Sequence, residues 1–233
     1  MRDTVGMTDV IDGYVAAVGR VLRGPRRLRA DMLAEIRDAL VDAAEGHLQG
    51  GAAAGEAARV AVDEFGPVSG VAAGLQRVLA VAQARRTAWW LLGVLGAHFA
   101  VTWYVGHSGQ WGRVWPDAPP PGAGYVALAA ATNVFVVGVL LAAGIAVGWG
   151  LRRSGGRRPV VRWTGGLAAA AVGVAVVATL VLTLLAPGVR LTAGVVWAAL
   201  TAVVPFMPVL LSAWRCWRVA GALAAPPARP VSR

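Results

Sequence analysis

Four long apolar segments lie in the last two thirds of the chain and limit what it can fold into. They cover residues 88–106, 125–150, 163–186 and 191–211. Each is close to the roughly 20 residues that a helix needs to cross about 30 Å of hydrocarbon. The hydrophobic share of 57% is also above that of an ordinary soluble domain. We therefore expect residues 87–214 to form a bundle of four transmembrane helices.

The charged residues are distributed unevenly along the chain. Eleven of the twelve acidic residues precede residue 65, and only Asp117 follows. The 22 basic residues are all arginines, eleven up to Arg86 and eleven after it, so the net charge of +10 belongs to the apolar part. A basic surplus can indicate a nucleic-acid partner. Here the arginines flank apolar segments, so we expect contact with the anionic headgroups of a lipid bilayer and no direct nucleic-acid binding.

The connections between the apolar segments differ in arginine content. Residues 151–162 hold five arginines and the proline-rich tail 215–233 holds four, whereas 107–124 and 187–190 hold one each. By the positive-inside rule, both termini and both arginine-rich segments are cytoplasmic. Arginine without lysine suggests a GC-rich bacterial genome, so we expect a multi-pass protein of a bacterial plasma membrane. An inner belt of tryptophans is expected at headgroup depth, at Trp89, Trp90, Trp149, Trp163, Trp214 and Trp217.

The first 86 residues have the pattern of short amphipathic helices. Gly24-Pro25 ends one helix and begins a long one, because proline fixes φ and lacks an N–H that the first helical turn leaves unbonded. Gly50-Gly51 ends the long helix, and Gly66-Pro67 ends a short third one. A fourth helix follows and meets no helix breaker before Trp89. This predicts a small cytoplasmic four-helix module over residues 1–86, so the whole fold is expected to be all-α.

The apolar positions of these helices predict the core of the module. We expect the first helix to run from Thr8 to Leu22 after a frayed tail of residues 1–7. The side chains expected to face the core recur at helical spacing. They are Val10, Tyr14, Ala17, Val18 and Val21; Leu28, Met32, Ile36 and Leu40; Ala57, Ala61 and Phe65; and Val68, Val71, Leu75, Val78, Leu79 and Ala82.

An acidic stripe runs beside the apolar one on the long helix. Its spacing of four, three, four and three residues keeps five carboxylates on one side. They are Asp31, Glu35, Asp38, Asp42 and Glu45. Two interpretations stay open. The stripe docks a basic partner, or it is a solvated face with local ion pairs, for example between Arg27 and Asp31.

The stretch GPRRLRADMLAEIRDALVDAAE, followed by EAARVAVDEFGPVSGVA, resembles the helical domain called permease prefix domain 1. It is also similar to the helix-turn-helix-associated α-helical signalling domain of bacterial membrane proteins. The resemblance covers roughly residues 8–86 and depends on the DEFG element combined with the Pro-Arg-Arg start. It implies a cytoplasmic regulatory module fused to membrane helices. The partner that it implies is a soluble cytoplasmic protein, such as a winged-helix repressor of the PadR-like class.

His98 and Asn133 are the polar candidate residues inside the apolar segments. An ionisable group within a membrane is costly, so His98 is a candidate proton or pH sensor. The alternative is a neutral imidazole hydrogen-bonded to a neighbour such as Asn133. Elsewhere, Gly144 and Gly148 have the spacing of closely packed helices. Pro205 is expected, together with Pro208, to bend the fourth segment.

We find no combination of residues that is typical of a catalytic site, so we expect no enzymatic activity. His47 has no second histidine nearby and is interpreted as a surface residue, so we expect neither a metal nor a cofactor. The function predicted is that of an integral membrane signalling or regulatory protein whose module docks a soluble partner. The alternatives are a small permease, an accessory subunit of a membrane transporter, and a purely structural membrane protein. The signal and the oligomeric state stay open.

Overall fold

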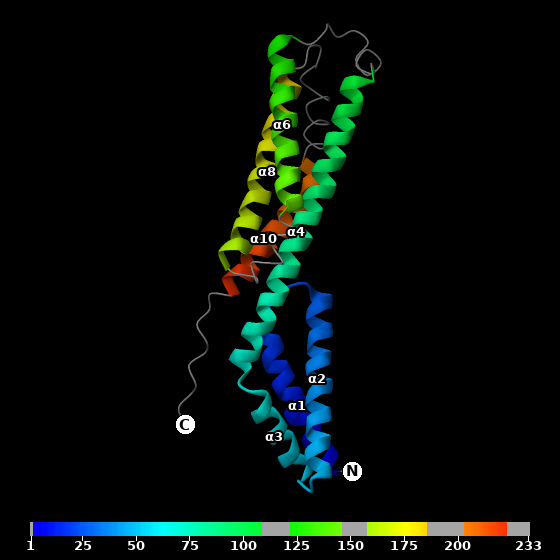
Figure 1. The fold of residues 1–233 in the computed structure, drawn as a ribbon, viewed down its shortest axis with the longest axis vertical. Coiled ribbons are helices and arrows are strands. Elements are labelled where there is room, and N and C mark those ends of the chain that lie inside the picture. The colour runs from blue at the N-terminus through cyan, green and yellow to red at the C-terminus, as the bar shows by residue number, and fades with distance from the viewer. Residues whose placement is uncertain (1, 109–121, 146–157, 186–202, 223–233) are drawn as a thin grey trace. The chain divides into compact units, whose positions relative to one another are not determined.

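The structure, a computed structural model, describes residues 2–108, 122–145, 158–185 and 203–222 (Figure 1). Every regular element in these ranges is a helix, and none of them contains a strand, which confirms the all-α prediction for this part of the chain. The chain divides into two compact units. The first is built mainly from residues up to Gln83, and the second mainly from Ala84 to Trp217.

The main part of the first unit is built from the helices at the start of the chain. They are α1 (Arg2–Val21), α2 (Arg26–Gln49), α3 (Ala54–Phe65) and the start of α4 (Val68–His107). The expected frayed tail is wrong for residues 2–7, because α1 already begins at Arg2. The side chain of Met7 packs against the core, and this contact stabilises the additional N-terminal turns of α1. Helix α4 is continuous past Trp89, as the lack of a breaker predicts.

Glycine and proline punctuate the first unit at the predicted places. Pro25 is the N-cap of α2 rather than its first helical residue, and its carbonyl oxygen accepts a hydrogen bond from the Arg29 N–H at 3.0 Å. Gly51 follows α2 with φ of 93°, and Gly66 ends α3 with φ of 97°. Residues with a side chain rarely adopt such angles, so glycine is required at both turns.

The core of the first unit follows the predicted stripes with three exceptions. Tyr14, Val18, Ile36, Leu40, Ala57, Ala61 and Leu79 are buried as expected, and Ile11 and Leu22 join them. Val21 and Val78 are wrong, because each is about half exposed (53% and 51%). Phe65 is also wrong at 37% exposed: it is the last residue of α3, and its ring lies nearly perpendicular to the Tyr14 ring, with ring centroids 6.1 Å apart. The buried stripe of α1 is Ile11-Tyr14-Val18 and continues at Leu22 just after the helix, which rotates Val21 outward.

The corner between α1 and α2 is held by α4. The side chain of Gln76, which is buried, pairs with both backbone polar groups of Arg23. Next to it, a β-carbon built on Gly24 would lie 2.9 Å from Cβ of Leu79, which is too close for any residue but glycine. The corner is therefore held against α4 by the hydrogen bonds of Gln76 and by the close approach of the Gly24 backbone to Leu79.

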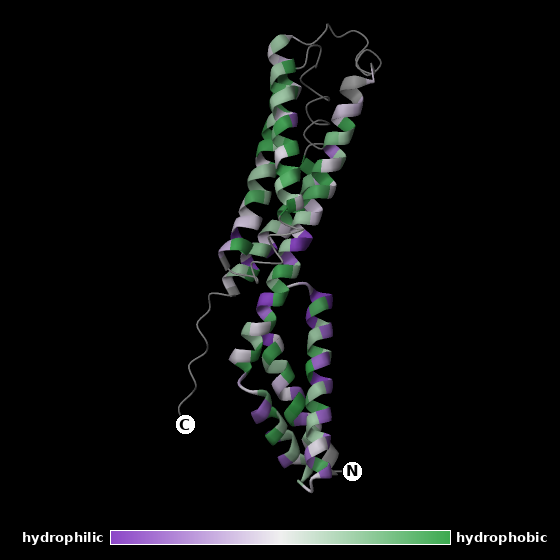
Figure 2. Cartoon of the chain, viewed as in Figure 1, coloured by the Kyte–Doolittle hydropathy of each residue, from purple (hydrophilic) through white to green (hydrophobic). Residues whose placement is uncertain are grey.

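The remaining helices are α6 (Ala123–Ile145), α8 (Arg158–Leu185), the 3₁₀ turn η2 (Val204–Phe206) and α10 (Met207–Ala222). The second unit contains the rest of α4 together with α6, η2, α8 from Pro159 onward and α10 up to Trp217. Among the described residues, two helices are long and apolar enough to cross a membrane, Ala123–Ile145 and Pro159–Leu185. Both are almost uniformly hydrophobic, whereas α1 to α3 are mixed (Figure 2). A third span results only if α3 and α4, which meet at a bend of 56°, count as one.

The predicted segments correspond to these helices in part. Helix α6 covers 125–145 of the second segment, and residues 146–150 lie outside the described ranges. Helix α8 begins five residues before the predicted 163, at Arg158. Most of the fourth segment also lies outside them, although its end changes from a 3₁₀ turn to an α-helix beside Pro205. Helix α10 continues through residues 215–222 of the predicted tail and ends at Ala222, with Cys216 and Val219 on its buried stripe.

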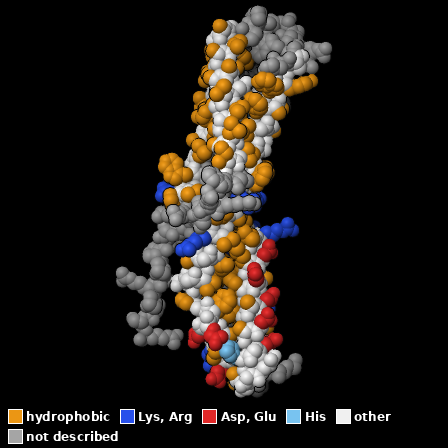
Figure 3. All heavy atoms as spheres, in the orientation of Figure 1, with side chains coloured by type: hydrophobic (Ala, Val, Ile, Leu, Met, Phe, Trp, Pro, Cys, Tyr) orange, Lys and Arg blue, Asp and Glu red, His pale blue; other side chains and the backbone are white. Residues whose placement is uncertain are grey.

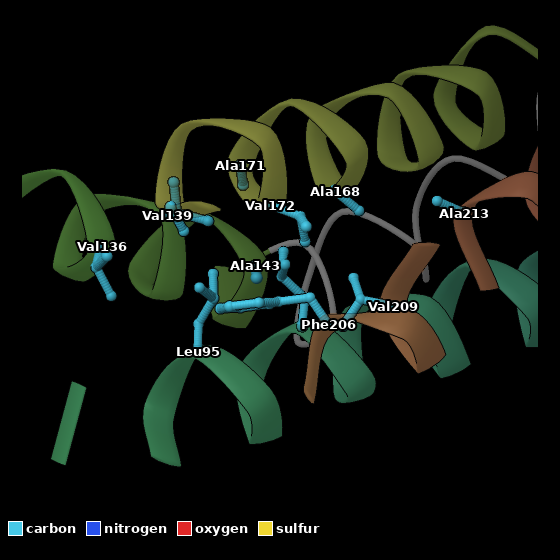
Figure 4. Packing of buried hydrophobic residues seen from close by; sticks show 12 residues of the cluster. Leu95, Val136, Val139, Ala143, Ala168, Ala171, Val172, Phe206, Val209 and Ala213 are labelled. Carbon is cyan, nitrogen blue, oxygen red and sulfur yellow. The ribbon is translucent and has the colours of Figure 1, made fainter. Parts of the chain in front are cut away.

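Apolar side chains from four helical segments form the core of the second unit (Figure 4). The ring of Phe206 is completely buried between them. Leu95 of α4, Val139 of α6 and Val172 of α8 belong to the same cluster. The short turn η2 therefore anchors the start of α10 in the unit, because it inserts the largest side chain of the cluster.

A buried polar cluster joins α4 to α10. The Thr87 hydroxyl lies 2.8 Å from the Ser212 hydroxyl and 3.1 Å from Sγ of Cys216. All three side chains are buried. Since buried hydroxyl and thiol groups are costly unless they are hydrogen-bonded, this cluster fixes which residues of α10 face α4.

Candidate functional site

The acidic stripe forms a continuous exposed surface on α2, which we call the acidic ridge: Asp31, Glu35, Asp38, Asp42 and Glu45. Ile36, Leu40 and Ala44 of the same helix are buried on its other side. Figure 3 shows acidic side chains in a row over α2. The sequence pattern placed these five side chains on one face, and the structure brings them together there.

The carboxylates of the acidic ridge make no ion pair with the described arginines of their own unit. Within the described residues none of its five carboxylates takes part in an ion pair, and the expected pair between Arg27 and Asp31 is not formed. Arg37 lies on the same helix, but its Nε donates a hydrogen bond to Asp12 of α1 at 2.7 Å. That hydrogen bond and the charge of Asp12 raise the pKa of the Arg37 guanidinium. The side-chain hydrogen bond of Arg37 is therefore made with α1 and not with the acidic ridge.

His47 lies at the end of α2 and pairs with Glu64 of α3. Its Nε2 is 3.1 Å from the carboxylate, and the carboxylate is exposed. The sequence pattern of α2 did not reveal this partner, because Glu64 comes from a different helix. In the ranges that the structure covers, no three histidine, cysteine or acidic side chains gather as metal ligands would.

His98 and Asn133 do not form the expected contact. The His98 ring is half-buried in the second unit and lies against Phe206, with ring centroids 5.6 Å apart and planes tilted by 58°. Among the described residues, neither the imidazole of His98 nor the carboxamide of Asn133 makes a hydrogen bond. The alternative of a mutual hydrogen bond is therefore wrong in this structure, and packing on an aromatic ring takes its place.

The inner-belt tryptophans that the structure describes are all exposed, between 41% and 77%. They are Trp89 and Trp90 of α4, Trp163 of α8, and Trp214 and Trp217 of α10, while Trp149 lies outside the described ranges. An indole with an apolar ring and a polar N–H suits the boundary between water and lipid. Gly144 does not pack closely, since a β-carbon there would meet nothing within 4 Å. Gly148 is not described.

Among the described glycines of the second unit, Gly165 of α8 is instead the one that approaches another helix most closely. A β-carbon built on it would lie 2.9 Å from Cδ1 of Trp217 and 3.1 Å from Cβ of Cys216. Glycine spacing alone could not distinguish this glycine from its neighbour Gly166. The buried polar residues Gln76 and Thr87 were equally missed, although each interrupts an apolar stripe of α4, which is a usable signal.

Comparison of the chain with protein-family models, with curated proteins and with solved structures found no match.

Proposed function

We propose that this is a membrane-anchored regulatory protein whose first unit docks a soluble, basic partner through the acidic ridge. The observation that carries the proposal is the row of five exposed carboxylates without an ion pair in the described part of the chain. A solvated face with no partner would gain from the local pair with Arg27, yet that pair is not formed. Complementary charge would speed the encounter and select a basic surface.

The resemblance to permease prefix domains suggests what the partner is. The partner that the resemblance implies is a soluble regulator, such as a winged-helix repressor, and the acidic ridge would occupy its basic surface. A repressor that binds DNA must carry such a surface to contact phosphates. Docking on the ridge would thus hold the repressor at the membrane and compete with its binding to DNA.

We also propose four membrane spans with both termini in the cytoplasm. Helices α6 and α8 supply two of them. The third is the part of α4 after Arg86, which holds no charged residue up to its end at His107. Helix α4 has a lower hydropathy because of its tryptophans, tyrosine and histidine, and such residues are common near headgroups. Residues 191–211 would be the fourth.

The test is the triple variant Asp38→Asn/Asp42→Asn/Glu45→Gln in the full chain. A cross-linked pull-down from native membranes with the wild-type protein first identifies the partner. The triple variant should fold normally and recover much less of that same protein, with the larger loss at low salt because ionic screening is weaker there. Single substitutions are expected to have little effect, since an exposed charge contributes only about 0–1 kcal/mol.

A matched control removes the same charge elsewhere on the first unit. Asp9→Asn/Glu56→Gln/Asp63→Asn changes three exposed carboxylates outside the ridge, none of them in a described ion pair. This control should keep the wild-type yield. Equal recovery from both triple variants would assign the ridge to solvation. The docking site would then be sought at the Phe65–Pro67 corner or in residues 152–158.

A further inference from the structure

The α8–α10 notch of the second unit combines a close helix contact with exposed charge and exposed indoles. We give this name to Arg162, Trp163 and Gly165 of α8 together with Trp217 of α10. Trp217 lies over Gly165, with Cδ1 and Nε1 within 2.9 and 3.1 Å of the position of a β-carbon. The ring therefore rests on the α8 backbone, which only glycine allows, and is still 55% exposed.

Arg162 stands one helical turn before Gly165, so both residues lie on the same face of α8. Its side chain is exposed, and the structure gives it no ion pair among the described residues. A carboxylate partner is scarce for a simple reason: after Glu64 the chain contains a single acidic residue, Asp117. The guanidinium is thus a cation that this half of the chain hardly neutralises.

The neighbouring surface is aromatic rather than polar. Trp163 is 77% exposed at the next position of α8, and Trp214 is 53% exposed one turn before Trp217 on α10. Directly after the notch, α8 becomes an uncharged apolar helix up to Leu185. The notch therefore stands where α8 passes from polar to apolar surroundings, which is the depth of lipid headgroups.

These features fit one kind of ligand. An anionic phospholipid offers a phosphate for the Arg162 guanidinium and acyl chains that continue along the apolar side of α8. A flat indole suits the glycerol region between them. Basic pockets between membrane helices bind acidic headgroups in this way. We propose that the α8–α10 notch binds the headgroup of an anionic phospholipid, with Arg162 contacting the phosphate and Trp217 forming the floor; this rests on the membrane placement proposed above.

The test uses the full-length protein in a neutral detergent, titrated with phosphatidylglycerol or phosphatidylcholine and analysed by native mass spectrometry. Phosphatidylglycerol should bind more tightly. Arg162→Gln should weaken it about fivefold, the loss expected for one arginine near an acidic lipid surface. Trp217→Leu should also weaken it. Arg59→Gln removes the same charge from an exposed site on α3 and should leave the affinity unchanged.

Other outcomes would overturn the proposal. Equal affinity for both lipids would exclude recognition of charge, and this comparison needs only the wild-type protein, so it decides even if a variant fails to fold. Displacement of the lipid by inorganic phosphate would make the notch a site for a free anion. Equal losses of affinity for phosphatidylglycerol in Arg162→Gln and Arg59→Gln would mean that the lipid does not bind at the notch. Partner capture by Arg162→Gln reports separately on the acidic ridge, which that variant leaves intact.

Discussion

Gln76 binds the backbone of Arg23 at both of its polar groups. Oε1 of Gln76 accepts a hydrogen bond from the Arg23 N–H at 2.9 Å, and Nε2 donates one to the Arg23 carbonyl oxygen at 2.7 Å. A carboxamide is the one side chain that can both donate and accept in this geometry. The corner before α2, the helix that carries the acidic ridge, is thereby tied to α4.

Replacing Gln76 by leucine should destabilise the first unit by about 2 kcal/mol, because two backbone groups of Arg23 lose their partner while the volume is kept. Hydrogen exchange should speed up at residues 20–28 of the full-length protein in lipid nanodiscs. The control is Gln49→Leu, which changes an exposed glutamine at the end of α2 and should leave the exchange unchanged. Unchanged exchange in both variants would mean that the corner holds without the side chain.

Leu40 and Val78 provide a test of the core. Leu40 is completely buried and Val78 is 51% exposed, although both belong to predicted apolar stripes. Leu40→Ala should cost about 2–5 kcal/mol of the free energy of unfolding, because it removes buried contacts and leaves a cavity. Val78→Ala should stay within about 0.5 kcal/mol. Thermal unfolding of the two variants measures the difference, and similar losses would contradict the described packing.

Alkaline pH should weaken the first unit through Tyr14. Burial raises the pKa of its phenol above the usual 10.0, and the neutral hydroxyl donates a hydrogen bond to the Gly66 carbonyl oxygen at 2.9 Å. Because the folded-state pKa is the higher one, this stabilisation is complete below pH 10.0 and is lost as the pH rises through the raised value. The free energy of unfolding, measured over roughly pH 8–11, should therefore decline as the pH rises. The Tyr14→Phe variant should not show this decline.

The proposed topology predicts which positions face each side of the membrane. Fusions that end at Gly46, Gly155 or Pro226 should give active cytoplasmic reporters, since these positions follow acidic or arginine-rich segments. Fusions at Gly109, Pro120 and Gly188 should report the outer side. An outer location for Gly155 would exclude the four-span arrangement, because it would place the five arginines of 151–162 outside.

Periodicity predicted the helices well because it reports a local property. Apolar side chains at helical spacing led to Ile36, Leu40 and Leu79 in the core, and glycine and proline marked the turns at Gly51 and Gly66. The wrong predictions concern the rotation of a helix about its own axis and the exact positions of helix ends. Val21 and Val78 stand at the edge of their stripes, where the choice between buried and exposed depends on the neighbouring helix and not on the helix itself.

Contacts between distant residues could not be predicted in the same way. Arg37 bonds to Asp12 on α1 rather than to an acid of its own helix, and His47 selects Glu64 on α3. Each of these partners is determined by how the helices pack against one another, and residue spacing within one helix carries no information about that packing. The five positions of the acidic ridge could be predicted from the sequence because they lie on a single helix. The α8–α10 notch could not, because it forms only where two helices pack together.

The buried polar cluster has a practical consequence for studying the molecule. Cys216 is the only cysteine of the chain, its thiol is completely shielded, and Thr87 is hydrogen-bonded to it. A thiol in that position is closed to maleimides, so the natural chain already behaves as a cysteine-free background. Spin labels and fluorophores can be attached at one introduced cysteine at a time while Cys216 continues to hold α10 against α4.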